Sequence, residues 1–214
     1  MAKKMLILTG PQGSGNHLWS KIFSLHPAVY GWKTLLDNYW ESHRHSEPFR
    51  TQWRNHELLK EFDWQQSDYY FTSISLPIGY RFTEDNDRVQ WTADIMGFTR
   101  TVLEQGVEVE IAVIGRDQNI LQHQQNRVRE ETTLSIFLSQ LPTLQNPTFL
   151  SYELLYLYKQ EYLKSLKLNI PIAWDDLRLG EILADDANEK YIHSIEYNEL
   201  DNGNKLGVTF TKKP

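Results

Sequence analysis

Apolar runs alternate with polar, helix-forming stretches along the chain. Residues 5–8 form a continuous apolar run that Gly10 ends, a pattern typical of a strand buried on both faces. Residues 16–25 then place apolar side chains at helical spacing, until a His-Pro pair at residues 26–27 ends the pattern. The start of the chain therefore predicts a strand, a glycine-rich turn and a helix.

The same order returns in the second half of the chain. Residues 110–114 form an apolar strand, which is followed by Gly-Arg-Asp at residues 115–117 and a polar helix over residues 119–129. Weaker patterns predict strands at residues 69–75 and 148–150 and a long helix at residues 152–168. Strands that alternate with helices indicate an α/β domain, here a three-layer domain of the P-loop type with a mainly parallel central sheet.

The C-terminal part has a different pattern. Two apolar-rich runs, residues 192–197 and 206–211, flank the turn-forming residues 201–204. This arrangement predicts a β-hairpin at about residues 191–214, appended after the last helix. Because no linker interrupts the 214 residues, we expect one domain over residues 1–214.

Composition narrows the classes of partner. Hydrophobic residues make up 40% of the chain, enough for a core, and 22 basic against 28 acidic residues give a net charge of -6. This charge disfavours a general electrostatic grip on nucleic acid or anionic lipid, so we expect neither nucleic acid nor membrane as a partner. The absence of cysteine excludes disulfides and thiolate sites, and without a long apolar run near the start we expect a cytoplasmic protein.

Ligands of parallel sheets lie at the carboxyl ends of strands, which directs attention to residues 9–17 and 115–124. Residues 10–17 read GPQGSGNH and match the glycine spacing of G-x-x-x-x-G-K-[ST], with Asn16 in the place of Lys and His17 in the place of Ser or Thr. The glycines allow successive backbone N–H groups to converge on an anion at a helix start. A tight turn without a ligand is the structural alternative.

The departures from the motif bear on the reaction. ATP- or GTP-using enzymes need the Lys for the terminal phosphates, and a hydroxyl and an acidic residue for magnesium. Here the second strand ends in Arg116 before Asp117, although Asp117 leaves a metal open. These loops favour binding of a phosphate-bearing nucleotide without a metal.

Three groups of segments, in order along residues 6–171, resemble the sulfotransferase family, which transfers a sulfuryl group from 3′-phosphoadenosine 5′-phosphosulfate to an alcohol or amine. The first, LTGPQGSGNHL at residues 8–18 with LHPAV at 25–29, is similar to the 5′-phosphosulfate loop and its helix. The second, IAVIGRD at residues 111–117, is similar to the strand whose Arg binds the 3′-phosphate. The third comprises residues 149–155, 162–166 and 168–171.

The resemblance implies two groups of nucleotide contacts. The 5′-phosphosulfate would be held by Gln12, Gly13, Ser14, Gly15, Asn16 and His17, and the 3′-phosphate by Arg116 and Gln124. The chain departs from the family where Gln12 or Gly13 replaces the basic residue of the first loop and Gln118 replaces a Pro. Charge would then come from Arg116, Lys21 or Lys33.

Sulfuryl transfer also needs a base and an acceptor site. Glu41 and His43, which follow the first helix, are the favoured bases, and His17 in the loop is a third catalytic candidate. Ser75 occupies the position of a family His and, with Trp40, is a candidate for the acceptor site. The alternative for residues 37–47 is a solvated polar loop, and a metal site at residues 43–45 lacks a third ligand.

Tryptophan is concentrated in the first half: six of the seven residues precede residue 100. They would suit an acceptor cleft, although core packing is the better explanation for any single one, and Trp40 is the best single candidate for the cleft. Ser151, before Glu153 at a helix start, reads as a cap.

The expected function is therefore a sulfotransferase that moves a sulfuryl group from 3′-phosphoadenosine 5′-phosphosulfate to a hydroxyl of a small molecule or glycan, without a metal. One alternative is a P-loop small-molecule kinase that uses ATP and magnesium. Another is a non-catalytic nucleotide-binding or interaction protein on the same fold.

Overall fold

The computed structural model describes residues 2–37, 47–76, 79–82, 88–129 and 133–184. The hairpin predicted near the C-terminus lies outside these residues.

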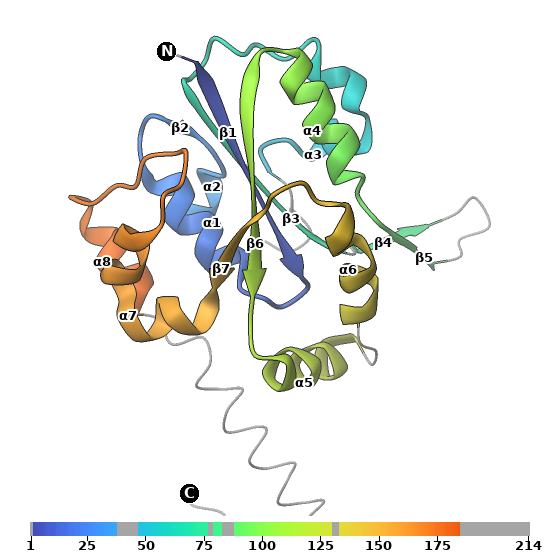
Figure 1. The fold of residues 1–214 in the computed structure, drawn as a ribbon, viewed down its shortest axis with the longest axis vertical. Helices are drawn as coiled ribbons and strands as arrows, with labels where there is room; N and C mark the ends of the chain where they lie inside the picture. Colours follow the sequence, from blue (N-terminus) through green and yellow to red (C-terminus); the bar gives the residue numbers. More distant parts are fainter. Residues whose placement is uncertain (1, 38–46, 77–78, 83–87, 130–132, 185–214) are drawn as a thin grey trace, which may run out of the picture.

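A five-stranded, all-parallel sheet forms the centre of the fold, as predicted (Figure 1). Its strand order is β2-β3-β1-β6-β7. The strands are β1 (Lys3–Pro11), β2 (Val29–Tyr30), β3 (Tyr69–Leu76), β6 (Val107–Gly115) and β7 (Thr148–Ser151). In the centre of the sheet, Ile7 of β1 is in register with Thr72 of β3 on one side and Ile111 of β6 on the other. This order places the ends of β1, β3 and β6 next to one another.

Helices connect the strands. The helices are α1 (Asn16–Leu25), α2 (Thr34–Asp37), α3 (Arg50–Arg54), α4 (Ile95–Glu104), α5 (Gln118–Arg129), α6 (Leu134–Gln140), α7 (Tyr152–Ser165) and α8 (Leu177–Ala184), with short 3-10 helices η1 (His56–Leu59) and η2 (Leu141–Thr143). An antiparallel pair, β4 (Gly79–Phe82) and β5 (Arg88–Trp91), stands apart from the main sheet. Of the helices in these described ranges, none has the length and apolar character needed to cross a membrane.

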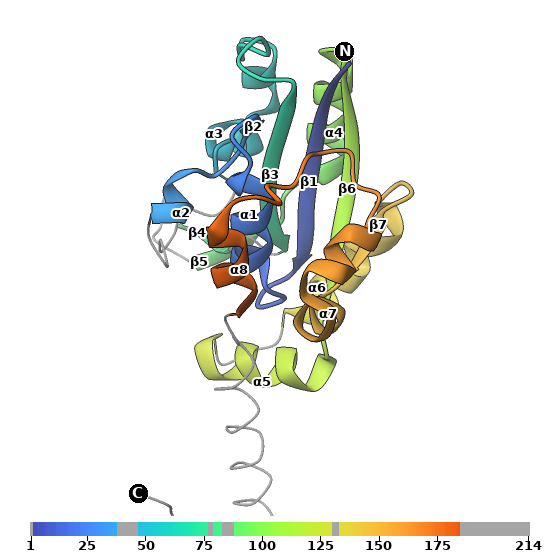
Figure 2. The ribbon, with the colours of Figure 1, turned by 90° about the vertical axis from the view of Figure 1, so that its left-hand side faces the viewer.

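The two faces of the sheet bury separate clusters of apolar side chains. On β1, Met5 and Ile7 pack in the cluster that includes α3, α4 and α6, while Leu6 and Leu8 pack in the cluster that includes α1, α7 and α8. Side chains alternate because successive residues of a strand point to opposite faces. Figures 1 and 2 show helices on both sides of the strands, so the predicted three-layer arrangement is confirmed.

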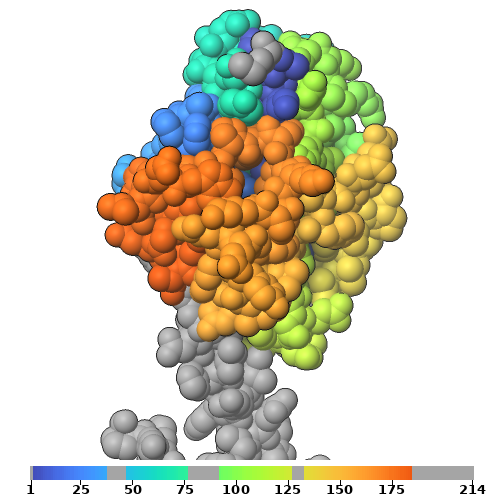
Figure 3. Space-filling model, turned by 60° about the vertical axis from the view of Figure 1, so that its left-hand side comes forward, coloured from blue at the N-terminus to red at the C-terminus, as the bar shows by residue number. Residues whose placement is uncertain are grey.

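Helix α7 differs from its prediction. The apolar stripe predicts a helix to residue 168, but α7 ends at Ser165 and has a non-helical residue inside it, Lys159, with φ 47° and ψ -122°. Its start is as predicted, because the hydroxyl of Ser151 accepts a hydrogen bond from the Leu154 N–H at 3.1 Å. Figure 3 shows α7 and α8 together on the outer surface of the molecule.

Candidate functional site

The loop between β1 and α1, residues 10–16, is shaped by glycines and is called the glycine loop below. Gly13 and Gly15 have φ values of 89° and 103°, in the left-handed region that disfavours other residues. A Cβ on Gly15 would lie 2.6 Å from the Tyr152 ring. The loop turns back on itself where the Ser14 N–H donates to the Pro11 carbonyl at 3.1 Å. Only glycine fits these conformations without strain.

The glycine loop leaves backbone donors available. The N–H groups of Gly13, Gly15 and Asn16 donate to no other residue in the part of the chain that the structure describes. Helix α1 has no side-chain cap and no acidic residue in its first turn. Uncapped N–H groups and the positive end of the helix dipole together attract an anion. The geometry therefore fits the anion site expected from the glycine spacing.

Arg116, directly after β6, joins the second loop to the first. Its guanidinium donates a hydrogen bond to the carbonyl oxygen of Gly13 and a second one, of 3.0 Å, to Oε1 of Gln124. The same group lies 4.5 Å from the centre of the Tyr152 ring. The expected proximity of residues 9–17 and 115–124 is thus present in the structure. Figures 1 and 2 both place α5 beyond the carboxyl ends of the strands, next to these loops.

A buried amide from α5 also contacts the glycine loop. The side chain of Gln125, only 1% exposed, donates to the Gln12 carbonyl at 2.6 Å and accepts from the Thr133 N–H at 2.8 Å. The Thr133 hydroxyl donates to Oε1 of Gln12 at 3.3 Å, and Gln12 is itself 2% exposed. The Gln12 side chain is therefore engaged inside the protein, on the side of Thr133. Helix α5 therefore holds the glycine loop in place through Gln125.

Asn16 connects the glycine loop to β3. Its Oδ1 accepts a hydrogen bond from the Ser14 hydroxyl at 2.8 Å, and its Nδ2 donates to the Ser73 hydroxyl at 3.2 Å. Ser75 is two residues further along β3, on the same face as Ser73, and is in register with Gly10. Ser75 accordingly lies beside the start of the loop.

Asp117, the acidic residue for which the sequence left metal binding as an alternative, caps helix α5. Oδ1 of Asp117 accepts hydrogen bonds from the N–H groups of Asn119 and Ile120, at 2.9 and 3.0 Å, and so caps α5. The Asp117 N–H in turn donates to Oε1 of Glu153 at 2.7 Å. Among the described residues, no group of three or more His, Asp or Glu side chains is arranged to hold a metal ion.

Of the three cations that the sequence left open as sources of charge for the glycine loop, Lys33 lies elsewhere. Its ammonium donates to the carbonyl oxygens of Ser24 and His26, at 2.6 and 2.8 Å, where α1 ends. Ten residues at 1.5 Å each separate the two ends of α1 by about 15 Å. Lys21 lies in the interior of α1. Arg116 contacts the loop directly.

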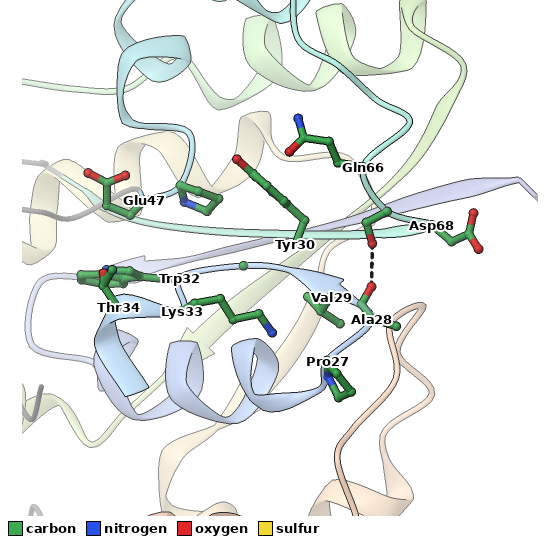
Figure 4. A pocket seen from close by; sticks show the side chains of 13 residues that line it. Pro27, Ala28, Val29, Tyr30, Trp32, Lys33, Thr34, Glu47, Gln66 and Asp68 are labelled. Atoms are coloured by element: carbon green, nitrogen blue, oxygen red, sulfur yellow. Dashed lines mark hydrogen bonds between the residues drawn. The ribbon is translucent and has the colours of Figure 1, made fainter. Parts of the chain in front are cut away.

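His17, in the first turn of α1, lies next to a groove. Its ring centre is 5.4 Å from that of Trp32, whose Nε1 donates to the Thr34 hydroxyl at 3.1 Å. Trp32 lines a groove of about 570 Å³ along the edge strand β2. In Figure 4 Tyr30, Glu47 and Gln66 lie on one side of this groove and Trp32, Lys33 and Pro27 on the other. Its aromatic and polar lining suits a ligand with both apolar faces and hydroxyl groups.

The remaining sequence candidates divide into two groups. Trp40, Glu41 and His43 lie outside the described residues. Core packing is confirmed for four tryptophans, which are at most 7% exposed: Trp19, Trp32, Trp53 and Trp64.

Sequence reasoning missed three contributors to the site: Tyr152, Gln125 and Ser73. Tyr152 was interpreted as part of a helix start, and its position against Gly15 has no local sequence signal. Gln125 and Ser73 act through contacts with residues far away in the chain. The glycine spacing and the end of β6 were, by contrast, readable signals.

Comparison with models of protein families finds no match for this chain, and a search of curated proteins finds none either.

Proposed function

We propose that the chain binds 3′-phosphoadenosine 5′-phosphosulfate and transfers its sulfuryl group to a hydroxyl of a small molecule or glycan. The contact between Arg116 and the Gly13 carbonyl supports this proposal most, because it brings a cation and the open N–H groups of the glycine loop to one place. A donor with two separate anionic groups needs two such neighbouring subsites. The motifs that resemble sulfotransferases lie at these positions.

In this proposal the 5′-phosphosulfate accepts hydrogen bonds from the N–H groups of Gly13, Gly15 and Asn16. The 3′-phosphate lies against Arg116 and Gln124. A guanidinium has five N–H donors in a rigid fork, so one Arg side chain can hold a loop carbonyl and a phosphate oxygen together. Because Oε1 of Gln124 accepts from Arg116, the NH₂ end of that amide is the end that donates to the phosphate.

Transfer requires that the acceptor hydroxyl lose its proton as its oxygen bonds to sulfur and the bond from sulfur to the phosphate oxygen breaks. His17 is the described candidate for the base, since it stands in the first turn of α1. The N–H groups of the loop stabilise the charge that develops on the leaving phosphate. The proposed acceptor site is the end of the groove at Trp32, whose ring centre lies 5.4 Å from that of His17.

Calorimetry with adenosine 3′,5′-bisphosphate and adenosine 5′-phosphate, both with a chelator present, tests the nucleotide assignment. We expect tight binding of the bisphosphate only, and a loss of about 1.5–3 kcal/mol in its binding free energy on Arg116→Ala, the range for hydrogen bonds to charged groups. Arg178→Ala is the matched control, because Arg178 is exposed and paired with Asp176 on the surface.

Three results separate the proposal from its alternatives. Equal affinities for the two nucleotides contradict the 3′-phosphate subsite. ATP binding that depends on magnesium indicates a kinase. Tight binding of the bisphosphate, without sulfated product when a panel of alcohols and glycans is analysed by mass spectrometry, indicates a non-catalytic binding protein.

A further inference from the structure

Three uncharged side chains form a hydrogen-bonded row beside the glycine loop. The Ser14 hydroxyl donates to Oδ1 of Asn16 at 2.8 Å, and Nδ2 of Asn16 donates to the Ser73 hydroxyl at 3.2 Å. Ser14 is fully buried and Ser73 is 4% exposed. The row therefore fixes the Asn16 amide between the loop and the end of β3.

Asn16, in the middle of this row, occupies the position at which a nucleoside triphosphate site has a positively charged residue. In the G-x-x-x-x-G-K-[ST] motif the residue at this position is a Lys that neutralises the terminal phosphates. Asn16 has no charge, and its Oδ1 and Nδ2 are each bonded to a neutral hydroxyl. The terminal group of a bound ligand consequently meets backbone N–H groups and neutral dipoles at this point.

Among the described side chains near the loop and the start of α5, one guanidinium stands against two carboxylates. The Arg116 guanidinium contacts the carbonyl of Gly13 and Oε1 of Gln124. Two carboxylates, those of Asp117 and Glu153, lie at the adjacent start of α5. The positive end of α1 corresponds to only about half an elementary charge.

Sulfuryl and phosphoryl groups differ in their negative charge. A terminal phosphoryl group has a charge of about -1.5 to -2 at pH 7, whereas the sulfuryl group of a phosphosulfate has a single negative charge. Additional charge that is removed from water without a counter-ion is strongly unfavourable. The glycine loop is therefore better matched to the sulfuryl group.

We propose that Asn16, held by Ser14 and Ser73, is a specificity-determining residue that makes the glycine loop select a terminal sulfuryl group over a terminal phosphoryl group. This inference rests on the proposed function and adds to it the reason for the replacement of the Lys. A purely structural role for Asn16 would change the affinity for both kinds of ligand by the same factor.

Two ligands that differ only in the terminal group provide the test. They are 3′-phosphoadenosine 5′-phosphosulfate and adenosine 3′-phosphate 5′-diphosphate, measured by calorimetry with a chelator present and without an acceptor. We expect the unmodified chain to bind the phosphosulfate at least about tenfold more tightly, a difference of about 1.4 kcal/mol. Asn16→Lys is expected to lower this ratio at least tenfold or invert it.

The controls address charge and folding. Gln65→Lys adds the same charge at an exposed position before β3, at the opposite end of the sheet from the glycine loop, and is expected to leave the ratio within twofold of its original value. Ser73→Ala keeps the charge of the loop and removes the bond that orients Nδ2, so we expect a ratio at least threefold lower. Thermal melts establish that each variant is folded, and Ser73→Ala remains a test if Asn16→Lys does not fold.

The outcomes distinguish this inference from the function on which it rests. If the unmodified chain binds both ligands with equal affinity, or if neither Asn16→Lys nor Ser73→Ala changes the ratio, the inference is overturned while nucleotide binding stands. If the unmodified chain binds neither ligand, the proposed function fails and the inference fails with it.

Discussion

The guanidinium of Arg116 and the carbonyl oxygen of Gly13 form a hydrogen bond that joins the loops after β6 and β1. Arg116 also lies over the Tyr152 ring, and the same ring lies against Gly15. The conformation of the glycine loop is therefore set by side chains from two other segments. Preformed donors of this kind reduce the cost of ordering that binding otherwise includes.

Removal of the Arg116 guanidinium should weaken the fold as well as ligand binding. Arg116→Ala leaves the Gly13 carbonyl and Gln124 without their donor and removes the contact with Tyr152, so we expect a loss of about 1–3 kcal/mol in the free energy of unfolding. Arg116→Lys should recover only part of this loss, because an ammonium lacks the planar fork. Urea denaturation measures both variants. Full recovery by Lys contradicts the proposed role of the fork.

Replacing three glycines by Ala separates the cost of a positive φ from the cost of the steric clash at Gly15. Gly106→Ala tests a positive φ of 75° alone, because no atom lies within 4 Å of a Cβ there, and we expect a loss of about 1–2 kcal/mol. Gly15→Ala combines a positive φ with the clash against Tyr152 and should lose more. Gly180→Ala, in open space within α8, should stabilise by up to about 1 kcal/mol. Chemical denaturation that ranks Gly15→Ala above Gly106→Ala in stability would contradict the packing described.

The buried amide of Gln125 should contribute more to the free energy of unfolding than its exposed neighbours on α5. Gln125→Leu removes the partners of the Gln12 carbonyl and of the Thr133 N–H, and we expect a loss of about 1–3 kcal/mol for each buried group left without a partner. Gln122→Leu, at an exposed position of the same helix, is the control. Similar unfolding free energies for the two variants would show that the loop is not held through Gln125.

Stability should decrease on acidification through His56. Burial lowers the pKa of His56, and the Asp94 carboxylate and a hydrogen bond with the Trp53 backbone offset only part of that effect. The unfolded chain, in which the pKa is near 6.5, then binds a proton before the folded one does. The contribution of neutral His56 is complete above about pH 6.5 and is lost as the pH falls below that value toward the lowered pKa.

Denaturation of the unmodified chain and of His56→Gln between pH 7.5 and 5 measures this contribution. We expect a smaller decrease in the unfolding free energy of the variant, since it lacks the titrating group. Parallel pH profiles for the two proteins would assign the acid sensitivity to other residues.

Local patterns predicted the elements that form the site, and they could have predicted more. The apolar run in β1, the glycines after it and the apolar spacing of α1 all arise within 25 residues. Helix α4 was missed although its signals were local: Asp94 accepts a hydrogen bond from the Gly97 N–H as an N-cap, and Ile95, Phe98 and Val102 form a buried stripe.

The contacts that hold the site have no comparable signal. Arg116 and Gly13 are 103 residues apart in the chain, and Gln125 and Gln12 are 113 apart. Their pairing follows from the order of β1 and β6 in the sheet and from the direction in which α5 leaves β6. The place of Lys33 could not be predicted for the same reason, because only the path of the chain after α1 brings its ammonium to the carbonyls of Ser24 and His26.

This position of Lys33 has an electrostatic effect at the other end of α1. The ammonium compensates the negative pole of the helix, so α1 and Lys33 together behave as a net positive body whose uncompensated pole faces the glycine loop. A chain with a net charge of -6 repels anions at long range. Close to the loop, the positive pole of α1 and the Arg116 guanidinium oppose that repulsion, and their attraction for an oxyanion acts at separations within the screening length of physiological salt.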